Sequence, residues 1–158
     1  LFQGTSATAF SPNTAMSRAM LVTVLYRLEG QPAITATNNF VDVQSGQWYS
    51  DAVIWANANG IVEGYAGLFG TNANVTREQL ATILYRYAEY KDYAVTQTAD
   101  LQAYSDATAI SAWALPAMQW ANAQGLITGR TTTTLVPGGS ATRAEVAAIC
   151  QRFINSTR

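Results

Sequence analysis

The chain has 158 residues, of which 49% are hydrophobic and 12% charged, and its formal net charge is −1. This length and hydrophobic content are enough for one domain, or for a few small repeats around a shared core, and they exclude a disordered chain. The nine Lys and Arg residues form no run, so the sequence lacks the charge pattern of a nucleic-acid binder. No apolar stretch approaches the length of a membrane span, and we expect no membrane insertion.

Side chains that usually carry catalysis are scarce. The chain has no His, which excludes Ser–His and Cys–His nucleophilic pairs, and a metal site would need carboxylates alone. Two carboxylates can serve a glycosidase, but none of the ten acidic residues forms a recognisable pair. Cys150 is the single cysteine and falls in an apolar stripe, which is typical of a small buried side chain. We predict a protein that is not an enzyme and uses no metal or cofactor.

The first residues already belong to a repeated pattern. Leu1-Phe2-Gln3-Gly4-Thr5 matches residues 61–65 (IVEGY) and 126–130 (LITGR) in register. Residues 1–4 can also be taken for the remnant of a cleavable tag, but a tag remnant has no reason to keep this register. We interpret them as native repeat sequence, so that the chain begins in the middle of a repeat.

A capped helix follows, and it occurs three times. The copies start with Ser17-Arg18-Ala19-Met20, Thr76-Arg77-Glu78-Gln79 and Thr142-Arg143-Ala144-Glu145. Ser and Thr are preferred N-cap residues, and Gln79 and Glu145 can close a capping box that Met20 cannot. Behind each cap, apolar residues at i, i+3, i+4 and i+7 predict one buried helix face. These residues are Leu21, Val24, Leu25 and Leu28, then Leu80, Ile83, Leu84 and Tyr87, then Val146, Ile149, Cys150 and Phe153.

Three such helices can bury their stripes against one another around a pseudo-threefold axis. The Arg after each cap is then expected to be exposed at the mouth of its helix. Free N–H groups in a first helical turn, together with an Arg, suit a carboxylate. We therefore expect three similar cationic helix N-termini, at Arg18, Arg77 and Arg143.

The second and third repeats follow linkers at residues 31–39 and 91–100. Residues 48–59 predict a short helix that ends at Gly60, and Gly125 ends its counterpart in the third repeat, where Pro116 suits the first turn. Loops rich in Gly, Thr and Asn, at residues 65–75 and 130–141, lead to the capped helices. The predicted units are 1–30, the second half of the first repeat, then 40–90 and 104–155.

These features together resemble a known family. The pattern combines Phe-x-Asp-Val at residues 40–43, a Trp seven places before Trp-Ala, Gly-Ile/Leu-x-x-Gly, a Phe eight places before Arg, and Thr-Arg-Ala-Glu. It resembles the surface-layer homology domain of bacterial envelope proteins over nearly the whole chain. The resemblance implies an all-α, pseudo-threefold spindle with a central three-helix bundle and prongs made of short helices and loops.

The resemblance also implies a role at the bacterial cell surface, in the cell wall or S-layer. Members of the family bind a peptidoglycan-linked secondary cell-wall polymer, commonly through pyruvylated N-acetylmannosamine, in grooves between adjacent repeats. Carried over residue by residue, the carbohydrate-binding positions are Arg18, Arg77, Arg143, Trp48, Trp113, Asp42, Asp106, Gly64 and Gly129. The groove around Arg18 and Trp48 is the one that the sequence favours.

Each of these positions also has a structural interpretation. Trp48 and Trp113 suit a groove wall or packing equally, and Asp42 and Asp106 suit turn caps better than sugar contacts. Trp55 and Trp120 are expected in the core. Arg27, Arg86 and Arg152 recur nine places after the motif Arg and are interpreted as structural. Repeat three carries Arg130 where repeat two has Tyr65, so equivalent grooves differ in charge.

Two functional questions stay open at this stage. A surface module for protein binding or self-assembly is the alternative to a wall-polymer lectin, because exposed aromatic residues can equally bind a partner protein. The first repeat also lacks a short helix, which predicts an uncovered apolar surface on the bundle. An upstream half-repeat or a second chain is expected to cover that surface.

Overall fold

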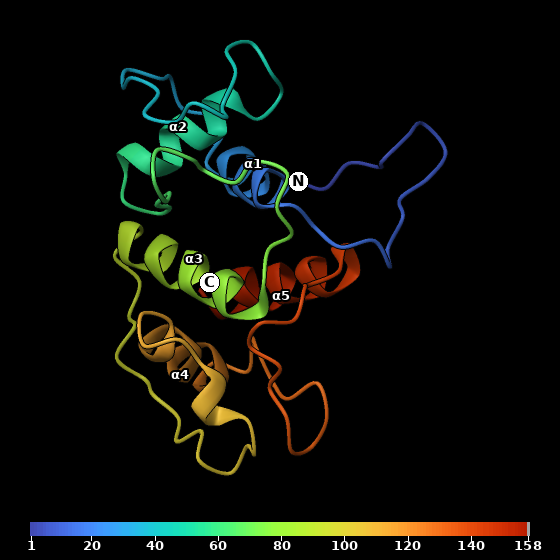
Figure 1. The fold of residues 1–158 in the computed structure, drawn as a ribbon, viewed down its shortest axis with the longest axis vertical. Helices are drawn as coiled ribbons and strands as arrows, with labels where there is room; N and C mark the ends of the chain where they lie inside the picture. Colours follow the sequence, from blue (N-terminus) through green and yellow to red (C-terminus); the bar gives the residue numbers. More distant parts are fainter. Residues whose placement is uncertain (158) are drawn as a thin grey trace.

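The computed structural model describes residues 1–157 and is helical. Its elements are α1 (Arg18–Leu28), α2 (Ser50–Ala58), α3 (Arg77–Tyr90), the 3-10 turn η1 (Ala107–Ala109), α4 (Leu115–Ala123) and α5 (Arg143–Ser156). Isolated β-bridges occur in this part of the chain, but no named strand does. Figure 1 shows α3 and α5 across the middle of the molecule, with α1 and α2 on one side and α4 on the other. The predicted all-α class is confirmed.

The long helices α1, α3 and α5 begin at the predicted caps. Ser17 accepts a hydrogen bond from the backbone N–H of Met20. Thr76 and Thr142 each form a capping box with the residue three places on, Gln79 and Glu145. Only α1 starts without the reciprocal bond, because a Met side chain offers no acceptor to the N–H of its cap.

Apolar faces of the long helices form a common core. Leu21, Leu25, Leu80 and Leu84 are at most 1% exposed, as the helical periodicity predicts. Across the bundle, the rings of Tyr87 and Phe153 lie 5.7 Å apart. Cys150 is also buried, and burial raises the pKa of its thiol to about 12. A thiol with that pKa is protonated at neutral pH, so the predicted inert role agrees with its environment.

Each short helix packs on the long helix of the preceding repeat. The ring of Trp55 on α2 lies 5.6 Å from that of Tyr26 on α1, and Trp120 on α4 lies 5.5 Å from Tyr85 on α3. Both Trp residues are buried, which confirms their predicted place in the core. The short helices end before glycines with positive φ (70° at residue 60 and 67° at residue 125), a conformation that suits Gly.

Three backbone hydrogen bonds close a ring around the pseudo-threefold axis. Met16 N–H donates to Ala141 O (2.9 Å), Ala141 N–H to Val75 O (3.0 Å), and Val75 N–H to Met16 O (2.8 Å). Each of these residues stands one place before an N-cap and is at most 1% exposed. Because each repeat donates to one neighbour and accepts from the other, the repeats are interlocked and do not pack as a linear array.

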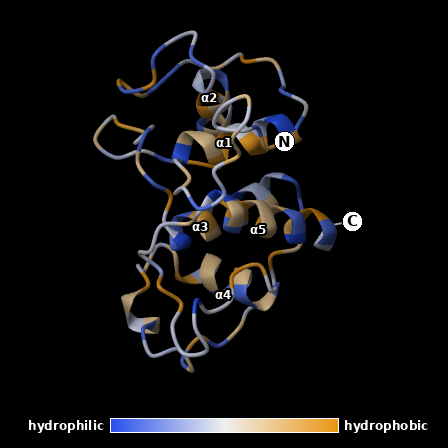
Figure 2. Cartoon of the chain, turned by 90° about the vertical axis from the view of Figure 1, so that its right-hand side faces the viewer, coloured by the Kyte–Doolittle hydropathy of each residue, from blue (hydrophilic) through white to orange (hydrophobic). Residues whose placement is uncertain are grey.

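The long helix α5 differs from α1 and α3, because within residues 1–157 no short helix packs along it as α2 does on α1 and α4 on α3, although the ring of Trp120 on α4 lies 6.3 Å from that of Phe153. Ala144, Ala148 and Gln151 are exposed there, whereas the equivalent α1 residues Ala19, Thr23 and Tyr26 are buried. Figure 2 shows hydrophilic residues at the end of α5. A face without a short helix is therefore present, and the exposed residues named on it are two Ala and one Gln. The expectation that an upstream half-repeat or a second chain covers an apolar surface stays a prediction.

Candidate functional site

The motif arginines reach from the start of one long helix into the loop of the next repeat. Arg18 donates from Nε to Phe69 O (3.0 Å) and from Nη2 to Glu63 O (3.0 Å). Arg77 makes the same pair of bonds to Leu135 O and Thr128 O at 2.8 and 2.6 Å. Arg143 donates to Phe10 O (3.0 Å) and to Gln3 O. The three arginines thus link the repeats in a closed cycle, from one to two, two to three, and three to one.

These side chains are not exposed at the helix mouths, and that prediction is wrong. Arg77 is 6% exposed and Arg143 4%, while Arg18 is half-buried. Arg18 and Arg143 also lie over the rings of Phe69 and Phe10, at 4.8 and 4.9 Å. Burial lowers the pKa of Arg18 and Arg77. Carbonyl acceptors from the neighbouring loop replace water around each guanidinium, which is why an N1 side chain can turn inward.

The N-termini of the long helices do not offer free N–H groups either. Arg18 N–H donates to Ala73 O (2.9 Å), and Ala19 N–H donates to Thr71 O (3.4 Å). The equivalent bonds on α3 and α5 go to Gly139, Pro137, Thr14 and Pro12, at 2.9 to 3.0 Å. Because these donors are occupied within the chain, the backbone N–H groups at the starts of α1, α3 and α5 are not free to bind a carboxylate.

Asp42 and Asp106 hold the loops that receive the arginines. The carboxylate of Asp42 accepts from the N–H groups of Phe69 and Gly70, both at 2.8 Å, and that of Asp106 from Leu135 and Val136, also at 2.8 Å. Their capping role therefore agrees with the structural interpretation. For Asp42, burial favours a higher pKa, but the N–H donors outweigh it and hold the pKa below its ordinary value. The pKa of Asp106 is lowered chiefly by the N–H of Leu135.

Gly64 and Gly129 lie where backbone segments approach closely. A Cβ at Gly64 collides with the carbonyl of Leu68 and the ring of Phe40, and a Cβ at Gly129 collides with the carbonyl of Thr131. Neither position requires a positive φ, so the glycines are needed for space. They allow the loops to fold tightly beside the arginines.

Two grooves lie between repeats, and each contains one exposed Trp. The first groove has a volume of about 320 Å³ and is lined by Phe2, Gln3, Met20, Arg27, Trp48 and Arg143, among others. The second groove has a volume of about 520 Å³, and its lining includes Glu63, Tyr65, Gln79, Arg86, Trp113 and Arg18. Trp48 is 57% exposed and Trp113 55%. Since Arg18 shares a groove with Trp113, the predicted pairing of Arg18 with Trp48 is wrong.

The grooves are built from equivalent positions of successive repeats. Each combines the motif Arg of one repeat, the loop and long helix of the next, and the Trp of the repeat after that. The sequence pattern does not reveal this pairing, because the short helix packs on the long helix of the preceding repeat and so carries its Trp one repeat further round the axis. Arg27 and Arg86 line the grooves as well, although the sequence favoured a structural role. Their recurrence nine places after the motif Arg was the available signal.

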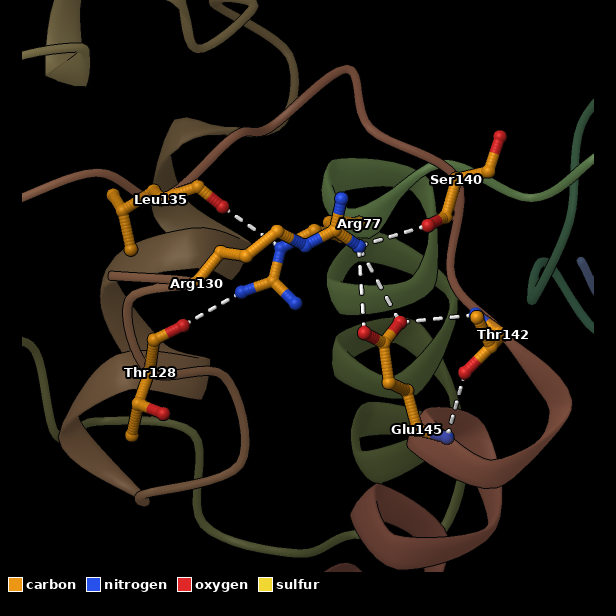
Figure 3. A network of polar contacts seen from close by, with 7 residues as sticks. All are labelled: Arg77, Thr128, Arg130, Leu135, Ser140, Thr142 and Glu145. Carbon is orange, nitrogen blue, oxygen red and sulfur yellow. Dashed lines mark hydrogen bonds and ion pairs between the residues drawn. The ribbon is translucent and has the colours of Figure 1, made fainter. Parts of the chain in front are cut away.

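The third equivalent surface is crossed by an ion pair. Arg130 takes the place of Tyr65, and its Nη2 donates to Ser140 O (2.9 Å) and lies 3.4 Å from Glu145 Oε2. In Figure 3, Arg77 extends to the loop carbonyls while Arg130 extends toward the start of α5. The repeats therefore differ in charge at this position as predicted, but the charge of Arg130 is paired with Glu145 of the same repeat.

Comparison with known proteins shows the family of the chain. Residues 39–81 and 103–147 match the family described as the S-layer homology domain. The chain belongs to this family. S-layer homology domains are non-catalytic modules of bacterial surface-layer proteins and cell-surface enzymes, and they mediate anchoring to the cell wall. The chain is accordingly a module of the cell surface, cell wall or S-layer.

Similar proteins include both enzymes and a surface-layer protein. An amylopullulanase of Thermoanaerobacterium thermosulfurigenes is 32% identical over 94% of this chain, and an endoglucanase of Bacillus sp. (strain KSM-635) is 33% identical over 96%. The surface-layer 125 kDa protein of Lysinibacillus sphaericus is 31% identical over 99%. The chain spans only 8%, 16% and 13% of the length of these three relatives.

Residues 1–157 also lack two other features that would bear on function. No group of three or more Cys, Asp or Glu residues in this range is arranged to hold a metal ion. Among the helices of the same range, none has the length and apolar character needed to cross a membrane.

Proposed function

We propose that this module anchors a larger protein to the bacterial cell wall by binding a pyruvylated secondary cell-wall polymer, without catalysis of its own. The observation that carries the proposal is the pair of equivalent grooves, each with an exposed Trp beside Arg side chains. Indole faces suit the C–H surfaces of sugars, and guanidinium groups suit the carboxylate of a pyruvate ketal.

The site residues divide into two roles in this proposal. Trp48 and Trp113 contact the sugar, together with Arg27, Arg86 and the accessible part of Arg18. Asp42, Asp106, Gly64 and Gly129 shape the loops that form the groove walls, and the buried Arg77 and Arg143 support the loops that they reach. This division follows from burial, because a side chain that already bonds to the backbone has few donors left for a ligand.

Sacculi of three kinds test the proposal. One kind carries a secondary polymer ending in pyruvylated N-acetylmannosamine, the second carries the same polymer from a strain that cannot add pyruvate, and the third has been stripped of the polymer. We expect the 158-residue module to cosediment with the first kind only. Equal sedimentation with all three kinds would contradict polymer recognition.

Variants in the grooves locate the binding. Trp48→Ala and Trp113→Ala are each expected to weaken cosedimentation, because a stacked ring is removed while the core is untouched. The matched controls are Val41→Ala and Arg152→Ala, since both residues are exposed and lie outside the two groove linings. Full binding by the double Trp variant rejects the grooves as the site.

A second candidate function is protein binding at the cell surface. Val41 and Tyr65 are 83% and 87% exposed, and a hydrogen bond from Val41 N–H to Gly67 O joins their two loops. Apolar side chains at such a position suit a protein partner or a second copy of the module. The sedimentation test distinguishes this function by two results together. Binding must survive removal of the polymer, and it must be lost in the double variant Val41→Ser with Tyr65→Ser.

A further inference from the structure

The two grooves differ at one equivalent position, which carries Gln3 in the first groove and Glu63 in the second. Each residue faces the Arg that recurs in mid-helix. Arg27 Nη2 donates to Gln3 Oε1 at 3.1 Å, and Arg86 Nη2 lies 3.4 Å from Glu63 Oε2. The same contact is therefore a neutral hydrogen bond in one groove and an ion pair in the other.

This difference changes the charge that a ligand meets. The lining of the first groove contains no carboxylate, and its cations are Arg27 and the buried Arg143, which is bonded to the carbonyls of Phe10 and Gln3. Arg27 also donates to Leu1 O (3.0 Å), so both of its partners are uncharged oxygens. A carboxylate that enters the first groove meets a guanidinium whose charge is not neutralised.

The second groove has a carboxylate at its rim, where it neutralises an Arg. The side chain of Glu63 is 73% exposed, and it neutralises Arg86 from the solvent side. The remaining cation, Arg18, is half-buried and bonded to the carbonyls of Phe69 and Glu63. A carboxylate that enters here approaches a like charge before it reaches either guanidinium.

We infer that Gln3 and Glu63 determine which sugar each groove binds, so that the first groove takes a carboxylate-bearing sugar and the second takes an uncharged part of the polymer. This inference rests on the proposed function, because it assigns the ligand of the same two grooves. When the module is bound to the polymer, its first groove then holds a charged terminal sugar and its second groove holds neutral sugars.

Trp signals can report the two grooves separately. Trp48 lines the first groove and Trp113 the second, while Trp55 and Trp120 are buried and serve as internal references. The ¹H–¹⁵N indole resonances are followed in titrations with two probes, the methyl glycoside of 4,6-pyruvylated N-acetylmannosamine and its parent without pyruvate. The N-terminus is acetylated so that the terminal ammonium near Gln3 adds no charge.

At low salt, we expect the pyruvylated probe to shift the Trp48 resonance at about fivefold lower concentration than the Trp113 resonance. A ratio of this size is what one solvent-exposed ion pair between the probe and the protein contributes to binding. The neutral probe is not expected to show this preference for Trp48. The reciprocal variant, with Gln3→Glu and Glu63→Gln together, is expected to reverse the order for the pyruvylated probe. Both changes are at exposed side chains, so the fold is retained.

Two results overturn the inference, and they are distinct from failure of the proposed function. The first is equal titration of Trp48 and Trp113 by the charged probe in the wild type, and the second is an unchanged order in the reciprocal variant. If either occurs while the wild type still binds pyruvylated sacculi, anchoring stands and the assignment of the grooves fails. If neither probe shifts any resonance and no sacculi are bound, both proposals fail.

Discussion

An Arg in the first turn of a helix usually extends into water, but in this protein it is part of the core. Arg77 is 6% exposed and gives two hydrogen bonds to carbonyls of the next repeat. A guanidinium can do this because its donors are fixed in one plane and match carbonyls from two points of a loop. The motif Arg therefore serves as a structural link between repeats, in addition to any contact with a ligand.

Arg77→Ala is accordingly expected to lower the free energy of unfolding by about 3 kcal/mol, since it leaves the buried carbonyl of Leu135 and the part-buried carbonyl of Thr128 without a donor. Arg77→Lys keeps the charge but not the forked geometry, and should recover only part of the loss. Urea unfolding followed by circular dichroism measures the effect. Arg152→Ala is the control because Arg152 is exposed on α5, and equal stability of the Arg77→Ala and Arg152→Ala variants contradicts the structural role.

The loop carboxylates make a separate prediction about pH. The pKa values of Asp42 and Asp106 are lowered in the folded protein, whereas an unfolded Asp titrates at about 3.9. Their contribution to stability is complete above this unfolded value and is lost as the pH falls through the lower folded values. We expect the melting temperature of the wild type to fall below about pH 4 for this reason.

Asp42→Asn tests that assignment. The variant should be less stable than the wild type at pH 7, because an amide cannot accept from all the N–H groups that the carboxylate binds. The variant should also lose less stability than the wild type between about pH 5 and about pH 3, because it has one titrating carboxylate fewer. These two pH values lie about one unit above and below the pKa of an unfolded Asp. Parallel pH profiles for the two proteins would show that Asp42 does not drive the acid response.

The sequence predicts where the long helices lie, but it does not predict which repeats they contact. Caps at Ser17, Thr76 and Thr142 and the stripes behind them act within a few residues, so the sequence alone locates α1, α3 and α5. The exposure of the motif arginines and the pairing of Arg18 with Trp113 depend on which repeat supplies each loop and short helix. That order is set by contacts between repeats, which no local pattern encodes.

The incomplete cap of α1 leads to a prediction at this scale. Met20→Gln supplies the acceptor that Gln79 and Glu145 provide in the other two helices, and it should stabilise the protein by about 0.5 kcal/mol. Met20→Leu is the matched control, because Leu has a similar volume and no acceptor. Thermal unfolding compares the three proteins, and a gain that is equal for Gln and Leu shows that capping is not its cause.

The three repeats are joined in a cycle rather than in a row. The backbone ring at Met16, Val75 and Ala141 and the arginine links each connect every repeat with the other two, with donors that run in opposite directions around the axis. In a linear repeat protein each unit contacts only its neighbours, and unfolding can begin at an end. A closed cycle has no free end, so loss of one repeat removes contacts from the other two.

This closure predicts that distant repeats unfold together. Leu25→Ala creates a cavity beside α1, at a residue that is 1% exposed, and should cost about 2–5 kcal/mol. Leu84→Ala and Ile149→Ala should cost similar amounts in α3 and α5, because those side chains are also buried. The folded indole resonances of Trp55 and Trp120, in different repeats, are followed through a urea titration of each variant. We expect both resonances to disappear at one urea concentration, which falls equally for the two in Leu25→Ala. A Trp120 resonance that persists after Trp55 has unfolded means that the cycle does not couple the repeats.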